Sequence, residues 1–467
     1  MGVARVASPG VLLAAVVVAY ALLRDRAAAG LPRAAFPDLL PAWNGSVPFS
    51  FPRALPVPEL MYNATMDGFV PLLMERYQPT VIKGSPVLDW GALRSWRGSG
   101  RLEQLLGPAV KAHVPADLVV RTHHTGQPFE ELANWTRPFR EAEVTPEALL
   151  RGDRLLYAMF DVHKLAPQLA KDIRASDLAV AWRAPLEVNM WIGGTSGITT
   201  PAHYDMAHNL YAQLRGYKRF ILFGPADVFH LYTFTNLHPS VRQTQVDFNH
   251  ASQWGRFPDF AKAQAYEVVL GPGDVLYVPP FVFHQVSVVT PPGAGPQTRE
   301  AVSVSVSVHT TSIEVDIRAN LIDRSLSLPV EKSWSRDTRI CALYWHFAVG
   351  VFANAEERTA FVSGMLRSSY SHFDLDEQNA PGLHEKIKEA RRHFPQGLQC
   401  GTEPGASFAP FVQTGLQVRR MARAASSLAV TSILMNGYIQ DCAELLLGPL
   451  DVDPFLRWLA GKKVVKE

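Results

Sequence analysis

Two histidines and one aspartate stand at positions from which they could together bind a metal ion. His203 and Asp205 are separated by one residue in the stretch Thr199–Pro225, and His284 ends the later stretch Gly271–His284. Alternate side chains on a β-strand point to the same face, so a strand here would place His203 and Asp205 side by side. Two histidines and a carboxylate on one side of a metal leave its other side open, as in non-haem Fe(II) oxygenases. We therefore predict one iron site with these three ligands.

Zinc is the main alternative metal, and the cysteine content argues against a thiolate zinc site. The chain has three widely spaced cysteines, Cys341, Cys400 and Cys442, all in its last third. They also exclude a disulfide framework, because at most one bridge can form and one thiol is left over. The pair formed by His203 and Asp205 is a weak signal by itself, since a hydrogen bond at a strand end explains it equally well.

The residues around these ligands have the patterns of strands in an antiparallel barrel. Leu210–Phe223 alternates and ends in an apolar run, which predicts one further strand. Val275–Val278 and Phe281–Val289 predict two more, joined by Pro279-Pro280. Ala301–His309 alternates between valine and serine, so we expect a half-buried strand with one apolar face. Inside such a barrel the three ligands can meet.

An iron site with open positions can take a chelating 2-oxo acid and then dioxygen. The second carboxylate of such a co-substrate needs a cation at the far end of the barrel. Lys218, on the strand after the His-x-Asp pair, is the candidate for this cation, and the hydroxyl of Thr200 could add a hydrogen bond.

Several short motifs are shared with a known family. They are Thr200-Pro-Ala-His-Tyr-Asp, Ala212-Gln213, Gly216-Tyr-Lys-Arg, Ile221-Leu-Phe, Arg242-Gln243 with Gln245-Val-Asp-Phe, and Gly271-Pro-Gly-Asp-Val-Leu-Tyr with His284. These motifs resemble the JmjC (cupin-like) 2-oxoglutarate oxygenases, above all the asparaginyl hydroxylases among them, densely over residues 190–310 and more weakly over 50–190. The resemblance implies a mainly β double-stranded β-helix, a jelly-roll or cupin barrel, with flanking helices.

The same resemblance implies roles for single residues. The metal would be Fe(II), bound by the three ligands named above, and the co-substrates would be 2-oxoglutarate and O2. Tyr157 would assist Lys218, and Asn209 would lie beside the metal. Counting Ser307, the co-substrate pocket would contain Lys218, Thr200, Tyr157, Asn209 and Ser307. The target side chain would be held by Arg242 and Gln243.

Three departures from the family pattern concern the substrate and co-substrate pockets. Met206-Ala207-His208 replaces a more polar run. Ser307 stands where an asparagine would close the co-substrate pocket, and His309 stands where a tryptophan would lie. His208 follows Asp205 by three residues, so its side chain should face away from the metal. The same class of chemistry survives these changes, but the same substrate does not follow.

Residues 1–29 have the features of a secretory signal peptide. Arg5 precedes the apolar run Val11–Leu23, and Ala27-Ala28-Ala29 offers a cleavage site. A membrane-spanning helix needs about 20 apolar residues, so an uncleaved type II anchor is the second choice and a transit peptide the third. We expect the protein in the secretory pathway lumen (ER or Golgi) or secreted.

Three N-glycosylation sequons agree with this address, at Asn44, Asn63 and Asn134. Residues 30–55 are rich in proline and alanine, which predicts a linker. We place the oxygenase domain at 56–315 and a helical region at 316–467.

The part before the metal motifs alternates between strands and helices. We predict a strand then a helix over 77–96, a helix then a strand over 100–125, and short helices at Thr145–Leu150 and Leu165–Ile173. Between the metal motifs, Asp227–Phe260 is a long insert that we expect to help roof the pocket. Its three histidines are more simply loop residues than a second metal site; they are His230, His238 and His250.

Apolar residues recur at helical spacing in the last third of the chain. The predicted helices are Asp316–Leu326, Arg336–Phe352, Ala355–Arg367, Leu383–His393, Phe411–Met435 and Asp441–Leu447. They can pack against the barrel or, as in related hydroxylases, form a homodimer.

The formal net charge is only +2, so the chain has no global footprint for nucleic acid. We predict a dioxygenase that hydroxylates a protein or peptide side chain. Demethylation of N-methyl lysine uses the same oxidant, but no basic nuclear run is visible. The alternatives are a non-catalytic cupin-type binding protein and a lumenal scaffold with a vestigial barrel.

Overall fold

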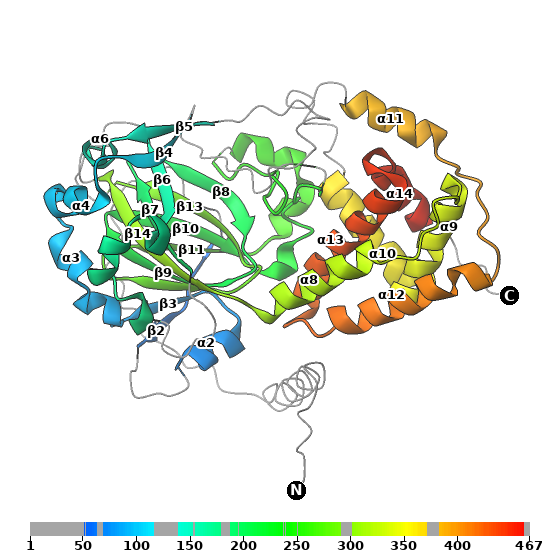
Figure 1. Cartoon of the computed structure of the whole chain (residues 1–467), viewed down its shortest axis with the longest axis horizontal. Helices are drawn as coiled ribbons and strands as arrows, with labels where there is room; N and C mark the ends of the chain where they lie inside the picture. The colour runs from blue at the N-terminus through cyan, green and yellow to red at the C-terminus, as the bar shows by residue number, and fades with distance from the viewer. Residues whose placement is uncertain are drawn as a thin grey trace, which may run out of the picture.

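The structure is a computed structural model of the chain. It describes residues 51, 53–62, 69–115, 139–152, 155–178, 187–194, 196–236, 238, 240–249, 251–290, 301–370 and 383–461. A β-barrel and a group of helices lie side by side (Figure 1). The predicted leader, the three sequons and most of the predicted linker lie outside the described residues. Among the helices that the structure describes, none has the length and hydropathy needed to cross a membrane.

Two sheets form the barrel. In spatial order, the five-stranded sheet contains β1 (Leu55–Pro56), β11 (Ala265–Leu270), β10 (Tyr217–Phe223), β13 (Phe283–Val289) and β8 (Thr199–Tyr204). The nine-stranded sheet contains β2 (Glu59–Met61), β3 (Thr80–Lys83), β12 (Val275–Val278), β9 (His208–Arg215), β14 (Ser303–Thr310), β7 (Glu187–Gly193), β6 (Tyr157–Asp161), β4 (Val110–Pro115) and β5 (Phe139–Val144). From β11 to β14 the chain passes from one sheet to the other at every strand. The predicted cupin-type barrel is confirmed.

The single strand predicted over Leu210–Phe223 is wrong, because this stretch contains the end of β9 and all of β10. The two strands meet at Gly216, whose φ is +65°, a conformation that glycine adopts without strain. A Cβ at this position would also collide with the backbone carbonyl of Val302. The alternation of the sequence continues through this turn, which is why the pattern alone did not reveal it.

Strand β14 is buried on both faces, so the predicted half-buried strand is wrong. Its valines belong to the apolar cluster beneath the flanking helices. Its serines are also fully buried, and Ser305 and Ser307 bond to Tyr211 and Trp191 inside the barrel. The barrel interior is lined with polar groups, and a serine face therefore fits there.

Short helices cover the outer face of the nine-stranded sheet. They are α3 (Gly91–Ser95), α4 (Ser99–Leu106), α6 (Pro146–Leu150) and α7 (Val162–Leu165), with α2 (Phe69–Arg76) preceding β3. Thr145 caps α6 by accepting a hydrogen bond from the Ala148 amide, as the Thr-Pro start predicts. The predicted helix at Leu165–Ile173 is instead the end of α7 followed by a 3-10 turn over Pro167–Lys171.

The C-terminal region is helical, as predicted. Its α-helices are α8 (Ile313–Leu326), α9 (Arg336–Trp345), α10 (Ala355–Met365), α11 (Leu383–His393), α12 (Ala409–Ala422), α13 (Leu428–Leu447) and α14 (Val452–Gly461). The helix predicted over Phe411–Met435 is wrong, because α12 ends and Ser427 then caps α13 by accepting from the Val430 amide. The segment predicted at Asp441–Leu447 is the end of α13.

One apolar core joins the helices to the barrel. It contains Phe223 of β10, Phe248 and Phe260 of the insert, and Ile433 and Tyr438 of α13. The insert therefore lies between the barrel and the helical region, as Figure 1 shows for the chain between β10 and β11.

Covalent and polar contacts stabilise this arrangement. Cys341 and Cys400 form a disulfide, and Cys442 is free and buried, as expected for one bridge and one remaining thiol. In the insert, the Asn236 side chain donates to the carbonyl of Gly437 and to the carboxylate of Asp441.

Candidate metal centre

The three predicted ligands meet inside the barrel. Strands β8 and β13 are antiparallel neighbours, and His203 lies directly opposite His284. One donor atom from each of His203, Asp205 and His284 lies within 4.8 Å of the others. The distance from His284 Nε2 to Asp205 Oδ2 is 3.7 Å, and the two imidazole centroids are 4.4 Å apart. In the part of the chain that the structure describes, this is the one metal-type group of three or more such side chains.

Backbone carbonyls orient both histidines. His203 Nδ1 lies 2.8 Å from the Pro201 carbonyl oxygen, and His284 Nδ1 lies 3.0 Å from that of Val282. A carbonyl can only accept, so Nδ1 carries the proton in each ring. The Nε2 atoms are then left with lone pairs for a metal, and the rings are held in a fixed orientation.

Asp205 is prepared as an anionic ligand. Burial alone would raise its pKa, but electrostatic interactions with the His203 and His284 side chains, and smaller ones with His309 and Arg242, lower it well below its ordinary value. Two neutral imidazoles and one carboxylate are a donor set that suits non-haem iron. The residues present therefore fit Fe(II).

An irregularity in strand pairing brings Thr200 to the same interior. Strict alternation would place Thr200 and His203 on opposite faces of β8. The register of β8 against β13 shifts by one residue between His284 and Val286. Because of this shift, His203 pairs with His284 and Thr200 pairs with Val286, and both partners face inward. Thr200 lies opposite Val286 and shares a hydrogen bond with Tyr157, whose pKa is raised by burial to about 12.

Lys218 is a buried cation without an anionic partner in the described chain. Its side chain is 1% exposed, and its Nζ donates to the hydroxyl of Tyr211 at 2.6 Å. The Nζ atom also lies 5.7 Å from the centroid of the Tyr157 ring. Burial lowers the pKa of Lys218 to about 7. A buried ammonium beside neutral hydroxyls favours an incoming carboxylate, so these residues fit the far end of a 2-oxo diacid.

The other predicted co-substrate residues also face this interior. Ser307 accepts a hydrogen bond from Trp191 Nε1 at 2.7 Å, so its hydroxyl already has a partner. Asn209 is buried on β9, opposite His309 of β14. Trp191 was missed by sequence reasoning, because a tryptophan on a strand is more often a core residue.

Gln243 and Arg242 lie beside the metal strand, on a short segment that pairs with β8. The backbone of Gln243 forms an isolated antiparallel β-bridge with that of His203, and the Tyr204 amide donates a hydrogen bond to the Arg242 carbonyl. Arg242 has φ of +75°, a strained conformation that tends to mark functional sites.

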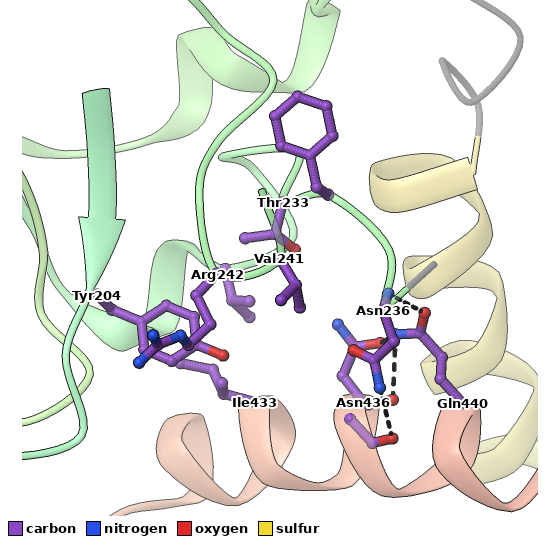
Figure 2. A pocket seen from close by; sticks show the side chains of 11 residues that line it. Tyr204, Thr233, Asn236, Val241, Arg242, Ile433, Asn436 and Gln440 are labelled. Carbon is purple, nitrogen blue, oxygen red and sulfur yellow. Dashed lines mark hydrogen bonds between the residues drawn. The ribbon is translucent and has the colours of Figure 1, made fainter. Parts of the chain in front are cut away.

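The Arg242 side chain lines a cleft at the boundary with α13 (Figure 2). Tyr204 and Arg242 form one side, and Asn436 and Gln440 of α13 form the other. The sequence pattern gave no sign that α13 contributes here, because its contribution depends on long-range packing.

The remaining histidines near the centre have other partners. His208 Nδ1 lies 2.8 Å from the Tyr277 hydroxyl, and burial lowers the His208 pKa to about 4, so the prediction that it faces away from the metal is confirmed. His230 contacts Asp227, and His238 stacks on Phe234. His250 lies outside the described residues.

Residues 69–309, just over half of the chain, match the model of the cupin-like domain. The chain belongs to the cupin-like domain family. It is 28% identical over 229 residues to Jumonji C domain-containing protein 5 of Drosophila melanogaster, and the match covers 48% of this chain and 54% of that protein. The cupin-like resemblance inferred from the motifs is confirmed.

Two other relatives have different names. The chain is 27% identical over 239 residues to tRNA wybutosine-synthesizing protein 5 of Danio rerio, covering 47% of this chain and 67% of the relative. It is 28% identical over 218 residues to lysine-specific demethylase 8 of Xenopus tropicalis, covering 45% of each. The chain spans about half the length of the first and last of these three relatives.

Replacing His284 should strongly weaken metal binding, whereas replacing His208 should not. We expect the wild-type protein to bind one Mn(II) or Fe(II) ion and His284→Ala to bind at least about 100-fold more weakly, because one of three ligands is lost. His208→Gln is the matched control, since glutamine keeps a polar partner for Tyr277. Anaerobic titration calorimetry gives both affinities. Wild-type affinity in His284→Ala would contradict the assigned ligand set.

Proposed function

We propose that this protein is an Fe(II)- and 2-oxoglutarate-dependent dioxygenase that hydroxylates a side chain of a protein or peptide. One observation carries the proposal: the same barrel holds the three-ligand group and, opposite a position four residues beyond His284 on β13, the buried Lys218 without a counter-ion in the described chain. A metal-binding protein needs only the first feature. A 2-oxo diacid uses both.

The residues would divide the work as follows. His203, Asp205 and His284 would hold the iron, and Lys218 with the paired hydroxyls of Thr200 and Tyr157 would orient the co-substrate. When bound, iron and 2-oxoglutarate supply an oxidant from O2: one oxygen atom enters a substrate C–H bond and the other leaves in succinate, with release of carbon dioxide. The barrel contributes orientation and the exclusion of water.

Two residues near the metal strand support a polar target side chain. Gln243 lies beside His203, and Arg242 offers a guanidinium in a cleft otherwise lined by neutral residues. The relatives' names include a lysine demethylase and a tRNA-modifying protein, so the family accommodates different substrates. A net charge of +2 gives no support to a nucleic-acid substrate here.

The second candidate is a cupin-type protein that binds a metal or ligand without turnover, or acts as a scaffold through its helices. This candidate is suggested by Ser307 and His309, which replace the asparagine and the tryptophan of the family pattern and so alter the co-substrate pocket. Against it, Ser307 is incorporated into a hydrogen bond with Trp191, and the triad and Lys218 are all present.

We also propose that the protein enters the secretory pathway. The apolar N-terminal run and the sequons support this address, and so does the Cys341–Cys400 bridge, since such bridges persist mainly in oxidising compartments.

Purified residues 30–467 with Fe(II), ascorbate and 2-oxoglutarate should release succinate without added substrate, because many such enzymes turn over slowly when uncoupled. The double variant His203→Ala, Asp205→Ala should lose this activity. Succinate is quantified by mass spectrometry. Absence of turnover together with absence of iron and 2-oxoglutarate binding would reject the enzyme and favour the scaffold.

The same assay separates substrate residues from the metal centre. With a pool of peptides that stimulates succinate release, Gln243→Ala should reduce the stimulated rate and leave the uncoupled rate unchanged. An equal loss of both rates would show that Gln243 supports the metal centre and does not hold a substrate.

Affinity for 2-oxoglutarate should fall as pH rises above about 7. Free Lys218 has a pKa of about 7, so above this pH it must take up a proton before it can pair with the carboxylate. The dissociation constant should then increase up to about tenfold per pH unit. Titrations at about pH 6.5 and pH 8.5 test this, with Lys218→Arg as the control that stays charged. A flat profile in the wild-type protein would place the distal carboxylate elsewhere.

Full-length protein made in a secretory cell line should lose mass on treatment with an N-glycosidase. A variant with glutamine at Asn44, Asn63 and Asn134 should show no such loss, because the acceptor amides are gone. Gel mobility measures the shift. A wild-type protein that is recovered from the cytosol and is unaffected by the glycosidase would contradict the secretory address.

A further inference from the structure

Two neighbouring strands each contribute one side chain beside the metal site: Asn209, already expected in the co-substrate pocket, and His309, to which no role has been assigned. Asn209 of β9 and His309 of β14 are direct register partners. The next inward-facing pair along the same ladder is Tyr211 and Ser307, which face the co-substrate interior. Alternation along both strands therefore places Asn209 and His309 on the inner face of the barrel.

Both side chains have a buried polar atom without a partner. In the described structure, Asn209 Oδ1 and His309 Nε2 are inaccessible to solvent and form no hydrogen bond. Buried polar atoms are nearly always paired, so each such exception needs an explanation. Two exceptions on adjacent positions of one face indicate a ligand that supplies the missing partner.

The surroundings of His309 place its ring beside the metal site. The side chains that interact with it electrostatically are those of Asp205, Glu187 and His284, and two of these are assigned metal ligands. An imidazole ring carries at least one N–H in either protonation state, so His309 can act as a donor. His309 itself does not belong to the group of donor atoms that lie within 4.8 Å of one another. Its place is therefore beside the ligand set and outside it.

We propose that His309 binds the co-substrate: its Nε2–H donates to the carboxylate at the metal end of the 2-oxo acid, beside Asn209, which the family resemblance already assigns to this pocket. A half-turn of the amide exchanges its oxygen and nitrogen, so Asn209 can present its NH2 group to that oxygen. This inference rests on the proposed function and deepens it. Lys218 would hold one end of the diacid, and His309 and Asn209 would hold the other.

In this arrangement His309 contacts the co-substrate and is not a fourth ligand of the metal. A ligand would change the affinity for the metal, whereas a co-substrate partner changes the affinity for the 2-oxo acid and leaves the metal affinity unchanged. Binding of the two can be measured separately and without turnover.

The test uses Mn(II)-loaded protein under anaerobic conditions, with calorimetric titration of 2-oxoglutarate. His309→Phe removes the donor and keeps a planar ring, and we expect about tenfold weaker binding, as for the loss of one hydrogen bond to a charged group. His309→Gln keeps an N–H donor and should recover most of the affinity. Mn(II) affinity should be the same in all variants.

Thr310→Val is the matched control. Thr310 is buried on the opposite face of the same strand, and its hydroxyl has no hydrogen-bond partner in the described structure, so 2-oxoglutarate affinity should not change. If His309→Phe does not fold, as judged by its thermal transition, His309→Leu takes its place.

Each contrary outcome has its own meaning. Unchanged 2-oxoglutarate affinity in His309→Phe would overturn this inference and leave the proposed function intact. A drop in Mn(II) affinity in that variant would overturn it as well, by making His309 a metal ligand. Failure of the wild-type protein to bind 2-oxoglutarate would overturn the proposed function itself.

Discussion

The pairing of β8 with β13 is the contact on which the rest of the site depends. It sets His203 opposite His284, and Asp205 follows at the end of β8, where the Phe281 amide donates to its carbonyl. Because imidazoles, a carboxylate and a lysine are enclosed together, the interior around them must be polar. The serine face of β14 and the hydroxyls of Tyr157 and Tyr211 supply that lining on one side. An apolar cluster that includes Phe220 and Leu222 packs against the Tyr211 ring on the other side.

The ligands could be predicted because period-two alternation is a local property of a strand, and His-x-Asp obeys it. Thr200 could not be assigned to the same face by alternation, since the register shift beside His284 depends on the partner strand. The turn at Gly216 and the inward serines of β14 were missed for a related reason. Both depend on what the neighbouring strand or the barrel interior offers, and the sequence of the segment alone does not contain that information.

The helical region is part of the architecture around the site. Its α13 supplies Asn436 and Gln440 to the cleft that Arg242 lines, and the insert is bonded to the same helix through Asn236. Residues more than two hundred positions apart in the chain therefore meet at one boundary. A change in the packing of α13 would alter the cleft around Arg242 without touching the metal ligands.

The orienting partners of the two histidines are the carbonyls of Pro201 and Val282, which belong to the main chain. Every amino acid has a backbone carbonyl, so no point mutation can remove these acceptors. In many metal sites a carboxylate side chain does this work and can be lost by one codon change. Substitutions around the site therefore leave the acceptors that orient the two imidazoles in place. The side chains that contact the co-substrate and the substrate can change during evolution without removing these acceptors.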